Sequence, residues 1–258
     1  MARKWTRFAH ADKAFEYEGT ALKKAWPRLH KGDREPYPKD AAVADAWRHF
    51  HAGRFEQAVD AGRAAGGPGV NAAVKAQCVY ASYVEREAKT RLALLDEAAR
   101  LADDRRKAAR RDANAHYVYA FALGRYGQAI SVAKALAQGL GGKIRDALTQ
   151  ALELDPKHAE AAVAFATYQA EVIHKVGAMI GGLTYGAKKD AALAHFETAL
   201  TLFPESPIIH IEYGNGLLLL FGKDRLDDAT KQYEIAAASA PHDAMEWLDV
   251  QRAKEELS

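Results

Sequence analysis

The sequence has a single cysteine, Cys78, among its 258 residues. No disulfide can form within the chain, and a protein of this kind fits a reducing compartment best. The positive charges of the N-terminus are not followed by the apolar core of a signal peptide. We therefore expect a cytoplasmic protein. Cys78 itself lies in an apolar stretch, where burial is expected to raise the pKa of the thiol and make it unreactive.

Long apolar runs and an excess of one charge are also lacking. The longest strongly apolar run covers residues 217–221, whereas about 20 residues are needed to span a bilayer. The 36 Lys and Arg residues nearly balance the 34 Asp and Glu residues, which leaves a formal net charge of +2. Such a chain has little general attraction to nucleic acid. We expect no membrane span and no nucleic-acid partner.

Motifs that carry chemistry are missing as well. His49 and His51 are two residues apart, so on a helix their side chains diverge and cannot readily hold one metal ion. Residues 139–143 are rich in glycine, but they lack the spacing of a phosphate loop, and Ile144 stands where that loop needs Ser or Thr. No nucleophile and base pair is evident. The sequence therefore predicts no catalytic residue, metal or cofactor, and a protein that is not an enzyme.

What the sequence does contain is a repeat. In three segments an alanine lies five residues before a proline, and a bulky apolar residue lies three residues before that alanine. The three sets are Leu148, Ala151 and Pro156; Phe196, Ala199 and Pro204; and Tyr233, Ala236 and Pro241. The spacing marks one stripe of a helix, which proline then ends because its ring prevents another turn.

A second pattern follows the first two of these prolines. It contains a large residue next to a small one, Phe165-Ala166 and Tyr213-Gly214. The small residue lets two antiparallel helices approach closely, and the large one fills the groove beside them.

These residues resemble the tetratricopeptide repeat family, whose 34-residue unit is a helix–turn–helix. The resemblance is good over residues 113–241 and weaker over 41–65 and 70–101. It implies an all-α fold, a right-handed superhelical solenoid of antiparallel helix pairs. We expect the solenoid to cover 41–258, with a capping helix at 243–257, after an N-terminal helical arm and linker at 1–40. Within the arm we expect residues 1–26 to form an amphipathic helix that packs through apolar residues such as Phe8, Phe15 and Leu22.

The third and fourth pairs are longer than the family's unit, since 46 residues separate Ala113 from Ala159. One interpretation is a pair of tall hairpins. The other places a turn at Gly124 and an extra helix, giving helices near 113–123, 128–138 and 143–155, and we favour it because glycine weakens a continuous helix. For the pair at 159–203 we expect long helices broken at Gly181-Gly182.

Two surfaces are candidates for partner binding. The resemblance implies a concave face formed by the first helix of each pair, which here carries Asn114, Tyr117, Phe121, Glu160, Thr167 and Asn215. The other is an edge of turns that combine glycine with basic residues, where Arg125, Lys188 and Lys189 lie near Tyr126 and Tyr185. Glycine and a cation also serve simply to cap a helix C-terminus, so capping stays open as the alternative.

Together these features predict a non-enzymatic scaffold that binds a protein or peptide, with oligomers possible. The alternative is an accessory protein that binds a small molecule or an anion. Residues 184–188 and the alanine-rich helix after them faintly resemble the tetratricopeptide-like T components of bacterial TRAP transporters.

Overall fold

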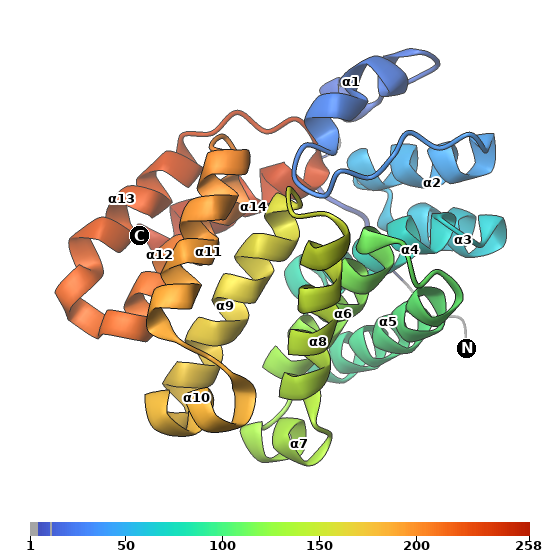
Figure 1. The fold of residues 1–258 in the computed structure, drawn as a ribbon. Helices are drawn as coiled ribbons and strands as arrows, with labels where there is room; N and C mark the ends of the chain where they lie inside the picture. Colours follow the sequence, from blue (N-terminus) through green and yellow to red (C-terminus); the bar gives the residue numbers. More distant parts are fainter. Residues whose placement is uncertain (1–4, 11) are drawn as a thin grey trace. The chain divides into compact units, whose positions relative to one another are not determined.

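The computed structural model describes residues 5–10 and 12–258. Every regular element in this part of the chain is helical, and it contains no strand (Figure 1). The chain divides into two compact units. Unit 1 contains the described residues up to His30 with Arg34–Ser131 and His242–Met245, and unit 2 contains Lys31–Asp33, Val132–Pro241 and Glu246–Ser258.

Unit 1 is a succession of helices, in which each helix from α2 onward is packed on the next. They are α1 (Ala21–Leu29), α2 (Ala41–His51), α3 (Phe55–Ala65), α4 (Gly69–Val79), α5 (Ala88–Ala108) and α6 (Ala113–Gln128), and a π-turn at Tyr80–Val84 extends α4. From α2 to α6 every helix contacts its successor, while α4 also contacts both α2 and α6. Contacts to the next helix and to the next but one are what stacked helix pairs produce.

Local sequence explains where these helices begin and how closely they pack. The side chains of Asp40 and Asp112 accept the backbone N–H groups of Ala42 and Ala115, at 2.9 and 3.2 Å, and so cap α2 and α6. Between α3 and α4 the backbones approach at Gly62, where a β-carbon would overlap the carbonyl oxygen of the facing glycine. Only glycine allows this approach.

Unit 2 repeats the same arrangement with two short additions. Its helices are α7 (Val132–Ala137), α8 (Leu140–Leu154), α9 (Ala159–Val176), α10 (Ala178–Tyr185), α11 (Lys189–Leu202), α12 (Pro207–Phe221), α13 (Leu226–Ala237) and most of α14 (Ala244–Glu256). The helix α9 contacts α8, α11 and α12, and α12 contacts α13. The short helices α7 and α10 both contact α8, and α10 also lies along α9.

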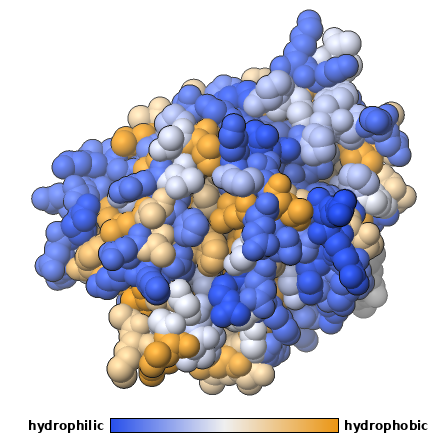
Figure 2. Space-filling view, in the orientation of Figure 1, coloured by the Kyte–Doolittle hydropathy of each residue, from blue (hydrophilic) through white to orange (hydrophobic). Residues whose placement is uncertain are grey.

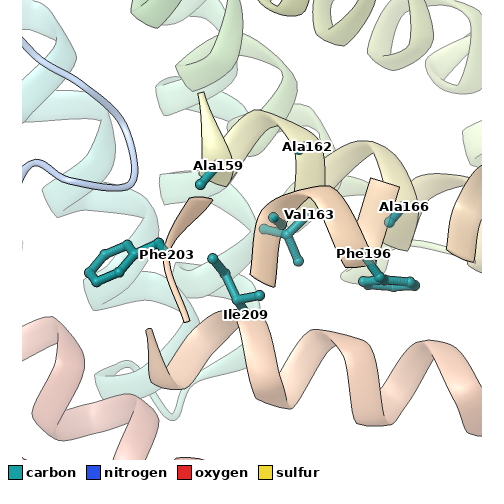
Figure 3. Close-up of a cluster of buried hydrophobic side chains, with 8 residues drawn as sticks. Ala159, Ala162, Val163, Ala166, Phe196, Phe203 and Ile209 are labelled. Atoms are coloured by element: carbon teal, nitrogen blue, oxygen red, sulfur yellow. The ribbon is translucent and has the colours of Figure 1, made fainter. Parts of the chain in front are cut away.

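The predicted apolar stripes form the core of unit 2. The bulky residues Leu148, Phe196 and Tyr233 are buried, and so is the alanine three residues after each of them. Figure 3 shows Phe196 and Ile209 beside the small side chains of α9, with which they form one apolar cluster. Large side chains from α11 and α12 therefore fill the space that the alanines of α9 leave.

The large–small pairs also act as predicted. A β-carbon on Gly214 would lie 2.7 Å from Cε1 of Tyr233, so the glycine leaves room for this ring of α13. Phe165 packs its ring on that of His195 in α11, with 4.9 Å between the ring centroids. The large–small pattern in the sequence thus marks positions where neighbouring helices pack closely.

The N-terminal arm differs from the prediction. We expected a helix over residues 1–26, but among residues 5–10 and 12–20 only a 3₁₀ turn, Lys13–Phe15, is helical, and α1 begins at Ala21. Residues 1–4 and 11 lie outside the described part of the chain. The predicted apolar residues Phe8, Phe15 and Leu22 are nevertheless buried. An extended segment can therefore bury its aromatic side chains without the helical period that we assumed.

The predicted breaks at glycine are also wrong. Helix α6 continues through Gly124, so the turn predicted there is absent. The extra helix of the favoured interpretation is present as α7, although it has only six residues. Gly181 and Gly182 lie inside α10, whereas Gly177 (φ 83°) and Gly186 (φ 69°) bound that helix. Positive φ angles are tolerated by glycine, so these two glycines mark the real breaks.

Candidate functional site

The two histidines considered as metal ligands have different surroundings in unit 1. Nδ1 of buried His51 lies 2.8 Å from Oδ2 of Asp243, and its Nε2 lies 3.2 Å from Nε2 of His30. His49 instead accepts a hydrogen bond from Nε of Arg54 at 3.0 Å. Among residues 5–10 and 12–258 no group of three or more His, Cys, Asp or Glu side chains could hold a metal ion.

Cys78 lies inside α4 and is fully buried. This burial raises the pKa of the thiol to about 12. The thiolate that would act as a nucleophile or metal ligand is therefore scarce at neutral pH.

The predicted partner residues of α6 lie mostly inside unit 1. Asn114, Tyr117 and Tyr126 are buried. Phe121 is half-buried and stacks on Tyr117 with 6.0 Å between ring centroids, and the guanidinium of Arg125 lies 5.3 Å from the centre of the Phe121 ring. Of these five residues only Phe121 and Arg125 are partly exposed. Partner binding by all five stays a prediction.

The predicted residues of α9 and α12 are hydrogen-bonded within unit 2. The hydroxyl of Thr167 donates to Oε2 of Glu212 at 3.3 Å, and Oδ1 of Asn215 accepts from the hydroxyl of Tyr233 at 2.7 Å. The backbone N–H of Glu160 donates to the carbonyl of Gly32 at 3.1 Å. These bonds join neighbouring segments of the fold, and a role in partner binding is left untested.

The two predicted lysines differ from each other. Nζ of Lys189 donates to the carbonyl of Leu220 at 2.8 Å and lies 4.9 Å from the centre of the Phe221 ring. It thus caps the C-terminus of α12, the alternative that the sequence left open. Lys188 is exposed at the start of α11. Tyr185 packs at Gly141, where a β-carbon would come within 2.8 Å of its ring.

Sequence reasoning missed an open cleft in unit 1. It has a volume of about 410 Å³. Its lining residues are Trp5, Thr6, Arg7, Phe8, Glu16, Ala52, Gly53, Arg54, Phe55, Glu56, Gln57 and Tyr80. The sequence carried part of the signal, since residues 53 and 54 are one of the glycine–basic turns, but only the fold brings the N-terminal segment beside that turn.

One wall of this cleft is the N-terminal segment 5–8, which has no helical structure. The ring of Trp5 lies 4.2 Å from that of Tyr80, whose hydroxyl accepts the backbone N–H of Thr6 at 2.9 Å. The buried ring of Phe8 lies 6.0 Å from that of Phe55 and covers Gly53, where a β-carbon would overlap it. Two aromatic anchors and a backbone hydrogen bond therefore hold an extended segment on this surface.

The polar side chains of the cleft carry both signs of charge. Arg7 and Arg54 lie along it together with Glu16 and Glu56. Arg54 donates to Oε1 of Glu16 at 3.4 Å. The cleft can therefore pair with either a positive or a negative group of a ligand, while Phe8 and Phe55 supply apolar surface.

Comparison with known proteins identifies the fold. No family model matches the sequence, and no curated protein matches it. Among solved structures, a thermophilic tetratricopeptide repeat protein of Thermus thermophilus superposes with a TM-score of 0.57 and 16% sequence identity, over 83% of this chain and 98% of that one. The chain has a tetratricopeptide-like fold.

The added length in the tetratricopeptide-like unit 2 lies in α7 and α10. Along the sequence α7 lies between α6 and α8, and α10 lies between α9 and α11. These are the two places where the predicted pairs are longer than the 34-residue repeat. Throughout the described part of the chain, no helix combines the length and the apolar character that a membrane span requires.

Proposed function

We propose that this chain is a non-enzymatic scaffold of the cytoplasm that binds a short extended peptide of a partner protein in the cleft of unit 1. The observation that carries the proposal is the N-terminal segment, which lies extended along that cleft. Trp5 and Phe8 anchor it, and Thr6 donates its backbone N–H to Tyr80. A peptide that lies alongside this segment could make the same kinds of contact: with aromatic rings, with a hydrogen-bond partner for its backbone, and with side chains of either charge.

The dimensions of the cleft suit a few residues of peptide. A volume of about 410 Å³ is at the lower end of the range for ligand pockets. Gln57 and Glu56 of α3 stand at its edge and are exposed. A large side chain at position 57 would therefore occupy the space without disturbing the core of α3.

Selection from a random peptide library displayed on phage, with the full chain as bait, tests the proposal. Affinities of the selected peptides are then measured by fluorescence polarisation for the wild type and for Gln57→Trp. We expect Gln57→Trp to weaken binding at least tenfold, about 1.4 kcal/mol. The matched control is Asp60→Trp, since Asp60 is exposed on the same helix but does not line the cleft. The control should change affinity by less than about twofold.

A library that yields no binder, or binders insensitive to Gln57→Trp, would contradict the proposal. The alternative function, binding of a small molecule or anion, is separated by thermal unfolding in the presence of metabolites and inorganic anions. A ligand at 100 times its Kd adds about 2.7 kcal/mol to the free energy of unfolding. A stabilising metabolite together with a failed peptide selection would favour the alternative.

A further inference from the structure

The helix α10 presents the most exposed large apolar side chains in the described part of the chain. Met179, Ile180 and Leu183 are 75%, 51% and 85% exposed. At about 100° per residue these three positions fall within roughly 100° of one another around the helix. Gly181 is on the other side, buried against α9, where a β-carbon would lie 3.4 Å from Cγ1 of Val172. The apolar tip, Met179, Ile180 and Leu183, thus points away from the unit.

The surroundings of this tip keep it exposed. Left-handed Gly177 and Gly186 turn the chain out of α9 and back toward α11. In Figure 2 hydrophobic surface gathers at the lower left edge, over the position of α10 in Figure 1. Helix α7, which packs on α8 as α10 does, adds exposed Val132 and Leu136. Apolar surface of this kind marks an interaction site.

Basic residues are concentrated in the segments that contain and flank α7 and α10. Segments 131–145 and 172–189, which contain α7, α10 and the helix ends beside them, hold six Lys and Arg residues and no Asp or Glu. Three acidic residues, Asp146, Glu171 and Asp190, lie directly beside these segments in the sequence. Arg145 pairs with Asp146 at 2.7 Å and Lys175 with Glu171 at 2.8 Å. We define the basic rim as the exposed lysines Lys134, Lys143 and Lys188. These two segments hold a larger excess of positive charge than the whole chain, whose net charge is only +2. This end of unit 2 is therefore distinctly cationic.

We propose that the apolar tip and the basic rim dock unit 2 on an anionic phospholipid surface. The tip would enter the boundary between headgroups and acyl chains, and the lysines would contact lipid phosphates. A protruding tip requires a matching pocket on a rigid partner, whereas a fluid bilayer accommodates it without one. The lysines of the rim carry the charge opposite to that of anionic lipid headgroups. This surface lies in unit 2 and the peptide cleft in unit 1, so the two proposals are independent.

Flotation of the full chain with lipid vesicles tests the docking. The probes are phosphatidylcholine vesicles and vesicles in which about one-third of the lipid is phosphatidylglycerol. We expect at least tenfold stronger binding to the anionic vesicles, weakened by salt. Met179→Ser with Leu183→Ser, and separately Lys143→Glu with Lys188→Glu, should each reduce binding at least tenfold. Both pairs are exposed, and unchanged thermal melts would show that the fold is intact.

Matched controls come from the same unit. Leu226→Ser with Ile235→Ser removes exposed apolar side chains of α13, and Lys157→Glu with Lys254→Glu makes the same charge change elsewhere. Both should bind vesicles within about twofold of the wild type. A second readout places a polarity-sensitive dye on Leu183→Cys, which is feasible because Cys78 is buried. Its emission should shift to the blue with anionic vesicles, while a dye on Leu226→Cys should not respond.

Three results would overturn the proposal. One is a wild-type chain that fails to float with anionic vesicles. Another is equal binding by the wild type and Met179→Ser with Leu183→Ser. The third is an oligomer, seen without lipid by light scattering, that these two substitutions convert to a monomer, since the tip would then join two copies of the chain.

Discussion

Gly216 of α12 lies directly against the ring of Phe196 in α11. A β-carbon at position 216 would overlap Cε2 and Cζ of that ring. Phe196 is fully buried in the cluster formed with α9, so its ring has no room to withdraw. The glycine therefore sets how closely α11 and α12 approach.

Substitution of this glycine should destabilise the protein. Gly216→Ala forces the Phe196 ring or the helix backbone to move, and overpacking of a core costs about 1–3 kcal/mol. Urea denaturation followed by circular dichroism measures the change. Gly142→Ala is the control, because Gly142 lies within α8 with nothing within 4 Å of its β-carbon position. The control should stabilise the protein by about 0.5–1 kcal/mol. Equal effects of the two substitutions would contradict the packing explanation.

The sequence predicted close helix packing at Gly214 but not at Gly216, and the reason is physical. Gly214 follows a large residue, as Ala166 does in another repeat, so the close approach of two helices at this position could be inferred from the pattern. The contact of Gly216 depends on the rotation of α11 around its own axis, which periodicity alone does not determine. The same limit applies to α6, where glycine propensity favoured a break at Gly124 but packing on α5 continues the helix.

A second prediction separates the two lysines that follow Gly186. Lys189→Gln removes the cation that donates to the Leu220 carbonyl and lies over the Phe221 ring. We expect the free energy of unfolding to fall by about 0.5–1 kcal/mol, because the charge complements the C-terminal end of α12. Lys188→Gln, a change of the same kind at the adjacent exposed residue, should leave stability within about 0.3 kcal/mol. Thermal and urea unfolding measure both. A larger loss from Lys188→Gln would reverse this assignment.

The candidate sites were less predictable than the fold. Lys188 and Lys189 share one sequence signal, and only the position of the α12 terminus distinguishes them. The cleft depends on residues 5–8, which we expected to be helical and which the structure shows as an extended segment. Extended aromatic residues leave no periodic signal, since their positions are fixed by distant contacts such as that of Trp5 with Tyr80.

The third prediction concerns alkaline pH. Burial raises the pKa of Cys78 from 9.0 to about 12 and those of Tyr168 and Tyr233 from 10.0 to about 12. The folded state holds these protons more tightly than the unfolded state, so their contribution to stability is complete below pH 9 and is lost as the pH rises toward 12. Each group adds about 1.4 kcal/mol per pH unit to the slope between its two pKa values.

Urea denaturation at a series of pH values between about 8 and about 11 measures this slope. Cys78→Ala should make the decline with pH shallower from about pH 9 upward, whatever the cost of the small cavity at neutral pH. Tyr168→Phe should do so only above about pH 10. Its hydroxyl is buried with no hydrogen-bond partner in the described structure, so this variant should be at least as stable as the wild type at about pH 7. A slope unchanged in both variants would contradict the burial-based explanation.

The last prediction concerns the buried chain of polar groups from Asp243 to His30. Oδ2 of Asp243 lies 2.8 Å from Nδ1 of His51, so the carboxylate accepts a hydrogen bond from that N–H, and Nε2 of a neutral His51 then accepts from Nε2 of His30 at 3.2 Å. Asp243→Ala removes the acceptor and leaves a buried donor unsatisfied, which we expect to lower the free energy of unfolding by about 2–4 kcal/mol. Asp243→Asn retains an oxygen that can accept the same bond and should cost markedly less. Urea denaturation compares the variants, and ¹⁵N chemical shifts of the His51 ring report whether Nδ1 carries the proton. Equal losses in the two variants, or a wild-type ring protonated at Nε2 alone, would show that Asp243 does not determine the tautomer of His51.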